Sequence, residues 1–145
     1  MLKGVDPLLN ADVLYILRAM GHGDTLVISD TNFPSDSIAM QCAAETLGRI
    51  DNVPAARAVE AVMSVLPVEA VARMEVMGAP DEIPAAQAEV QAVVDRFEPQ
   101  LGKMGSIERF AFYEEAKKAY AVITTGERRF YGCFILTKGV VPPDA

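Results

Sequence analysis

Residues 10–30 read NADVLYILRAMGHGDTLVISD and contain a complete helix-to-strand unit. Asn10 is a favourable N-cap residue, and Gly21 supplies a stop signal, so we predict a helix over 11–20. Apolar residues recur inside it at helical spacing: Val13, Leu14, Leu17 and Met20. Residues 25–29 then form a short apolar run that ends at Asp30, which is typical of a buried strand. A helix that leads directly into a buried strand favours an α/β layered fold.

The same alternation continues along the rest of the chain. Further helices are predicted over 54–66, 84–97 and 110–118, and short strands over 71–77, at Ile107, over 120–124 and over 133–136. Alternating helices and short strands are typical of a layered domain with a mostly parallel sheet. We find no internal repeat, low-complexity stretch or linker, so we predict one layered α/β domain over residues 1–145.

The composition is apolar for a chain of this length. Hydrophobic residues make up 51% of the 145 residues, and the mean hydropathy is +0.20. A small domain has much surface to expose to water, so an apolar excess indicates surface that is buried against other subunits. We therefore expect a homo-oligomer.

Charge and residue counts exclude several classes of function. The net charge is −7 and the pI is about 4.7, which argues against binding to nucleic acid or anionic membranes. One histidine and two distant cysteines, Cys42 and Cys133, provide neither a metal-binding pattern nor a disulfide framework. The N-terminal residues have no apolar signal-peptide core and no apolar run is long enough to span a membrane, so we expect a cytoplasmic protein.

The single histidine is the first candidate for chemistry. His22 lies between Gly21 and Gly23, which leave room for a substrate beside the ring. An imidazole ordinarily titrates near pH ~6.5 and can both donate and accept a proton at neutral pH. The segment therefore favours an acid–base role, and a capping or core histidine is the alternative. There is no nucleotide-binding glycine fingerprint, Walker sequence or nucleophile elbow.

Four other polar residues complete the candidate set. Arg109 and Tyr113 are four residues apart, on one face at the start of a predicted helix. Asp30 follows a predicted strand, and ligands of α/β sheets collect at the carboxyl ends of strands. Tyr131 lies near the start of the last predicted strand, so this rule does not place it in a ligand site. Taken singly, Tyr113 is better explained as a packing aromatic and Arg109 as a surface ion-pair residue, and Asp30 is in a position where turn formers are common.

Six blocks of sequence carry a resemblance to a known family. They are MGHGD at 20–24, SDTNFP at 29–34, RFAFYE at 109–114, TGE at 125–127, YG at 131–132 and KGV at 138–140. In this order they resemble the L-fucose mutarotase branch of the D-ribose pyranase/fucose mutarotase family over nearly the whole chain. The RFAFYE block is the most specific of them, since it separates this branch from the ribose pyranases.

The resemblance implies a three-layer α/β fold, a cofactor-free and metal-free sugar isomerase, and homo-oligomeric rings, such as a decamer, with sites near subunit contacts. It matches His22 and Tyr113 to acid–base positions, and Asp30, Arg109 and Tyr131 to positions around the sugar. Glu69 and Met74 match weaker pocket positions. Cys133 stands where the family has asparagine, which puts one contact to a sugar hydroxyl in question.

The implied reaction is the interconversion of the α and β anomers of L-fucose, or of a related aldose, through the open-chain aldehyde. Positioned acids and bases contribute ~10²–10⁴-fold to such proton transfers. A phenol, with an ordinary pKa near ~10, is a better acid than base unless a cation such as Arg109 favours its ionised form. The alternatives are a pyranase acting on ribose-like sugars, a non-enzymatic sugar-binding accessory of a fucose transport system, and a purely structural ring-forming protein.

Overall fold

The computed structural model describes residues 1–145. The chain forms six strands and five α-helices: α1 (Ala11–Ala19), β1 (Thr25–Ser29), α2 (Ser35–Ala39), β2 (Leu47–Ile50), α3 (Ala55–Met63), β3 (Val68–Met74), α4 (Ala85–Phe97), a short 3-10 turn (Pro99–Leu101), β4 (Gly105–Ile107), α5 (Arg109–Lys117), β5 (Ala121–Thr125) and β6 (Phe134–Lys138). The longest helix, α4, has 13 residues, and no helix combines the length and apolarity that crossing a membrane would need.

The six strands form one mixed sheet in the order β2-β5-β1-β6-β3-β4. The pairs β1–β5, β2–β5 and β3–β4 are parallel, whereas β6 runs antiparallel to both of its neighbours, β1 and β3. The mostly parallel sheet predicted from the sequence is therefore confirmed. Because β6 is reversed, the residues that precede it lie at the edge of the sheet where the other five strands end.

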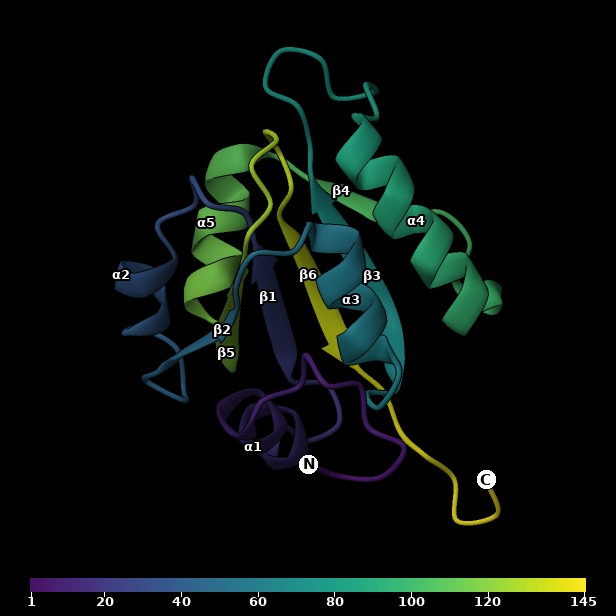
Figure 1. Ribbon diagram of the computed structural model, residues 1–145. Helices are drawn as coiled ribbons and strands as arrows, with labels where there is room; N and C mark the ends of the chain where they lie inside the picture. Colours follow the sequence, from purple (N-terminus) through teal and green to yellow (C-terminus); the bar gives the residue numbers. More distant parts are fainter.

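Helices cover both faces of the sheet and make the three layers that were predicted (Figure 1). Leu26 and Ile28 of β1 point to one face and pack with α1, α3 and α4 in the larger apolar core. Val27 points to the other face and packs with Phe112 in a smaller core under α2 and α5. This alternation follows from the two-residue period of a strand, which sends successive side chains to opposite faces.

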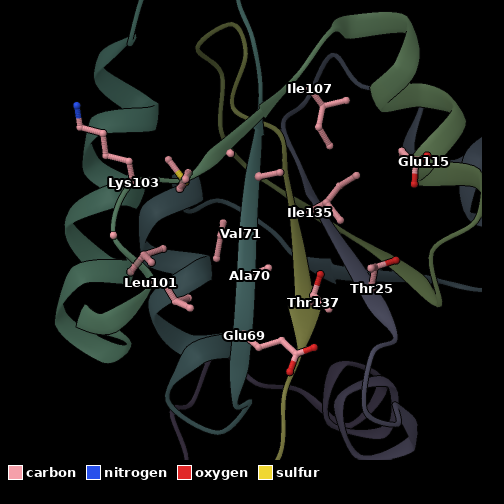
Figure 2. Close-up of a pocket in the computed structure, with 15 residues that line it drawn as sticks. Thr25, Glu69, Ala70, Val71, Leu101, Lys103, Ile107, Glu115, Ile135 and Thr137 are labelled. Atoms are coloured by element: carbon pink, nitrogen blue, oxygen red, sulfur yellow. The ribbon is translucent and has the colours of Figure 1, made fainter.

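The second face is only partly covered. Helices α2 and α5 lie over one half of it, and a hollow of about 420 Å³ remains over β3, β4 and β6 (Figure 2). Its floor consists of small or aliphatic side chains such as Ala70 and Ile135, and Glu69 stands at one end of it (Figure 2). An uncovered sheet face of this kind is unusual in a monomer, since sheets bury their apolar face.

The predicted strand over 71–77 is displaced, because β3 occupies Val68–Met74. Its pairing with β6 is irregular between Val68 and Ala70, and Arg73 is buried within it, so the side chains do not alternate simply between polar and apolar. The last strand is also longer than predicted, since Thr137 and Lys138 pair with β1 and β3.

The sequence did not predict α2 or β2. The former has five residues, too few for a periodic pattern, and the latter is an edge strand whose sequence, LGRI, contains Gly48 and Arg49. A side chain at Gly48 would come within 2.9 Å of Ile123 and 3.0 Å of Ile16, so glycine allows this strand to pack closely against α1 and β5. The other helix boundaries agree with the prediction to within three residues.

Candidate functional site

A pocket of about 350 Å³ lies at the carboxyl edge of the parallel strands. Nine residues line it: Asp30, Asn32, Phe33, Met74, Arg109, Tyr113, Phe130, Tyr131 and Cys133. Six of the eight residues singled out in the sequence are therefore brought together here, from four separate elements of the fold. The larger hollow on the sheet face has fewer groups suited to proton transfer, so we place the candidate site in the smaller pocket.

Helix α5 presents a phenol and a guanidinium to this pocket. The helix begins directly after β4, and Glu108 caps it by accepting the backbone N–H groups of Phe110 and Ala111, bonds that lower the pKa of the Glu108 carboxyl. One turn on, the Tyr113 hydroxyl accepts a hydrogen bond of 3.0 Å from Arg109 Nε. A phenol oxygen that accepts this bond keeps its own proton free to donate into the pocket.

The ring of Tyr113 is held by aromatic neighbours. Its centroid lies 5.5 Å from that of Phe33 and 6.2 Å from that of Phe110. The Arg109 guanidinium also lies over the Tyr113 ring, 5.5 Å from its centroid. These contacts restrict the direction of the hydroxyl, which is what a positioned proton donor requires.

Asp30 joins two loops at the rim of the pocket. Its Oδ1 accepts the backbone N–H groups of Asn32 and Phe33, and its Oδ2 accepts that of Gly132 at 3.1 Å. The carboxylate is almost fully buried. The turn-forming role considered from the sequence is thus present, and the lining position leaves Asp30 available to a ligand hydroxyl.

Tyr131 lies beside Asp30 because β6 is antiparallel. It has a positive φ of 60°, and its hydroxyl accepts a hydrogen bond of 3.2 Å from Met77 N. No local pattern predicted Tyr131 next to Asp30, since a residue before a parallel strand would lie at the opposite edge. The antiparallel direction of β6 explains why Tyr131 lies at the same edge as Asp30.

Cys133 lines the pocket but exposes only 1% of its surface. Burial raises the pKa of its thiol well above the ordinary value, and the neighbouring Asp30 carboxylate adds to this effect. The thiol therefore stays protonated, and it is a weak donor and a weak acceptor. The pocket at this point is less polar than it would be with asparagine.

His22 and Glu69 lie together at the opposite edge of the sheet. His22 follows α1 and precedes β1, and its Nε2 lies 2.9 Å from Glu69 Oε2. The two side chains are exposed to 59% and 47%. Within one chain, the carboxylate that contacts the imidazole is that of Glu69. The two predicted acid–base residues, His22 and Tyr113, are not brought together by a single chain.

Three residues of the pocket were not singled out in the sequence. Asn32 and Phe33 belong to the turn that follows β1, and Phe130 precedes Tyr131. Asn32 and Phe33 could have been predicted as site residues, because ligands bind at the carboxyl ends of strands in such sheets. Phe130 exposes 74% of its surface and had no such signal. No group of three or more His, Cys, Asp and Glu side chains in the structure could hold a metal ion.

A three-layer domain with a pocket at the carboxyl edge of its parallel strands belongs to the class of α/β proteins, in which ligands bind at that edge of the sheet. The chain belongs to the RbsD / FucU transport protein family, whose model matches residues 3–141. This confirms the family expected from the sequence.

Named relatives match over nearly the full length of the chain. Fucose mutarotase of Homo sapiens is 41% identical over 147 residues, covering 97% of this chain and 94% of the human protein. Protein Atu2016, whose crystal structure is known, is 64% identical in sequence to this chain. The two structures match with a TM-score of 0.95 over 98% of this chain and 97% of Atu2016. The fucose mutarotase of Streptococcus pneumoniae, solved in complex with L-fucose, is 32% identical in sequence to this chain. The two structures match with a TM-score of 0.86 over 97% of this chain and 100% of the other.

Proposed function

We propose that this protein is a fucose mutarotase, an isomerase that interconverts the α and β anomers of L-fucose or a closely related aldose. The observation that carries the proposal is the Tyr113 hydroxyl, hydrogen-bonded to Arg109 and directed by aromatic contacts at a pocket that Asp30 also lines. The relatives named fucose mutarotase over the full chain length support the choice of reaction and of sugar.

The reaction needs one acid and one base. Opening the pyranose ring removes the proton of the anomeric hydroxyl and protonates the ring oxygen. Rotation of the aldehyde and reclosure then reverse both transfers. Tyr113 is proposed to donate and recover one of these protons, because the Arg109 cation stabilises the charge that develops on its oxygen. Asp30 and Tyr131 are proposed to hold sugar hydroxyls.

The second proton-transfer group is proposed to be His22 of a neighbouring copy. Within one chain, His22 and Tyr113 lie at opposite ends of β1, and a strand of five residues spans roughly 17 Å. One sugar cannot touch both groups across this distance. Glu69 would hold the exposed imidazole in one orientation while it projects into the pocket of the next copy.

A contact between two different edges of the same chain is heterologous, and repetition of such a contact generates a ring when the rotation closes. We therefore propose a homo-oligomeric ring, for which a decamer is one form. Exposed apolar residues at the pocket edge support it: Met77, Phe110 and Phe130. Light scattering at micromolar concentration should give a multiple of 15.6 kDa, and a monomer mass would refute the ring. The cytoplasmic location stays a prediction from the sequence.

The proposed activity is tested by NMR exchange spectroscopy of anomer interconversion, with and without protein, for L-fucose, galactose, ribose and rhamnose. Faster exchange of L-fucose than of the other sugars is the expected result. Fastest exchange between the six- and five-membered rings of ribose would favour the pyranase alternative. Binding of a sugar with unchanged exchange would favour the non-enzymatic accessory.

Cys133 is the residue we expect to modulate the choice of sugar. Cys133→Asn is expected to lower the KM for L-fucose several-fold, because a neutral hydrogen bond contributes about 0.5–1.5 kcal/mol. The measurement is saturation kinetics of both forms on the same sugar panel. If the chain prefers another sugar, the substitution should instead raise the KM for that sugar. Identical profiles would remove position 133 from the site.

A further inference from the structure

Gln87 is a completely buried polar residue behind the pocket. It lies in the first turn of α4 and exposes 0% of its surface. Its Nε2 donates to the carbonyl oxygen of Met74 at 2.7 Å and to that of Tyr131 at 3.0 Å. Both of these residues line the candidate site. A single side chain thus bonds the backbone of two parts of the pocket wall.

The position requires a neutral group with two donors. The last backbone bond between β3 and the segment before β6 runs from Met74 N to Cys133 O, at 3.1 Å. Beyond this bond, no backbone hydrogen bond joins the two segments. The carbonyl oxygens of Met74 and Tyr131 both accept from the Gln87 amide instead. Two buried acceptors without a donor would each cost free energy, and only an amide NH₂ supplies two donors without a charge.

Arg73 completes the arrangement. Its buried guanidinium donates to Gln87 Oε1 at 3.0 Å, which uses the remaining polar atom of the glutamine. It also donates to the carbonyl oxygens of Pro80 at 2.7 Å and Glu82 at 3.3 Å. Arg73 therefore fixes the orientation of the amide and ties the loop after β3 to the same point.

This network holds Tyr131 at both ends. Gln87 bonds its carbonyl oxygen, and Met77, from the loop that Arg73 anchors, bonds its hydroxyl. A non-glycine residue at φ 60° is conformationally strained and needs surrounding contacts to keep it there. Without Gln87, the backbone of Tyr131 loses the contact that opposes relaxation away from this conformation.

We propose that Gln87 is a positioning residue, which sets sugar affinity by fixing the Tyr131–Met74 wall of the pocket. It touches no sugar itself and does not reach Tyr113, which stands on α5. The inference rests on the proposed function for its kinetic consequence, because Tyr131 is there assigned to the sugar. Its structural part, the restraint of the wall, is independent of any activity.

Gln87→Met is the test, since methionine has a similar shape and lacks both donors. We expect the KM for L-fucose to rise roughly tenfold, because displacement of a binding wall weakens every contact it makes. We expect kcat to stay within about twofold, because Tyr113 keeps its partners. The effect should shrink below about twofold in a Tyr131→Ala background, where the positioned side chain is missing.

The matched control is Gln91→Met, on the same helix one turn later. Gln91 also makes three hydrogen bonds, to Asp95, to the Gly102 carbonyl oxygen and from Met104 N, and none of them reaches the pocket. Equal KM changes in the two variants, or an undiminished Gln87 effect in the Tyr131→Ala background, would overturn the proposal. If Gln87→Met fails to fold, Gln87→Glu retains an acceptor for Arg73, lacks the two donors and should give the same KM rise.

A readout that needs no sugar separates this inference from the proposed activity. The Gly132 amide, bonded to Asp30, should exchange its hydrogen about tenfold faster in Gln87→Met than in Gln91→Met, because its loop is released. Unchanged protection would refute the restraint even in an active enzyme. Absence of anomer exchange in the wild-type protein, together with loss of Gly132 protection in Gln87→Met, would refute the proposed function alone.

Discussion

Tyr113→Phe is expected to lower the rate of L-fucose anomer exchange by ~10²–10⁴-fold, the contribution of a positioned proton donor. The substitution removes one hydroxyl and keeps the ring that packs against Phe33. Arg109 loses a hydrogen-bond acceptor but lies at the pocket rim, where water can replace it. The loss should therefore appear in kcat, with the melting temperature and oligomer mass nearly unchanged. NMR exchange spectroscopy and light scattering measure these quantities.

The matched control is Tyr15→Phe, which removes the same hydroxyl from a residue on α1 that exposes 72% of its surface. This variant should keep wild-type kinetics. A Tyr113→Phe protein that retains more than about half of the wild-type rate would show that the phenol only lines the pocket. The proton donor would then have to be another group.

His22→Ala is expected to cause a loss of similar size, about 10²–10⁴-fold, although His22 lies at the other edge of the sheet. The residue is exposed and contacts Glu69 alone through its ring nitrogen, so its removal should leave the fold of each chain intact. The rate is again measured by exchange spectroscopy. Full activity in this variant would mean that the imidazole is only structural.

Mixing the two inactive variants tests whether a site is shared. In a ring assembled from equal amounts of His22→Ala and Tyr113→Phe chains, about a quarter of the interfaces join an intact His22 to an intact Tyr113. Mixed rings, formed by co-expression, should therefore recover about a quarter of the wild-type rate. Rings of either variant alone should stay inactive. No recovery in mixed rings of confirmed composition would refute a site shared between His22 and Tyr113 of neighbouring copies.

Local patterns in the sequence were sufficient for the elements that depend on near neighbours. The helix and strand within residues 10–30 were predicted almost to the residue, because the N-cap Asn10 and the apolar period of α1 act over a few positions. The alternation of elements indicated a layered α/β fold with a mostly parallel sheet, and the family blocks indicated the three layers and the candidate site residues. A single histidine between glycines marked His22 without any knowledge of its neighbours.

The tertiary structure decided what depends on pairing between distant segments. Only the antiparallel insertion of β6 brings Tyr131 and Cys133 to the edge where Asp30 lies. Only the register of β3 places Glu69 against His22 and away from the pocket. The irregular pairing of β3 displaced that strand from its predicted range, and the edge position of β2 concealed it, because the side-chain patterns of both strands depend on partners far along the chain. The sequence by itself determined the local elements and the candidate residues, and long-range strand pairing determined which of those candidates line one pocket.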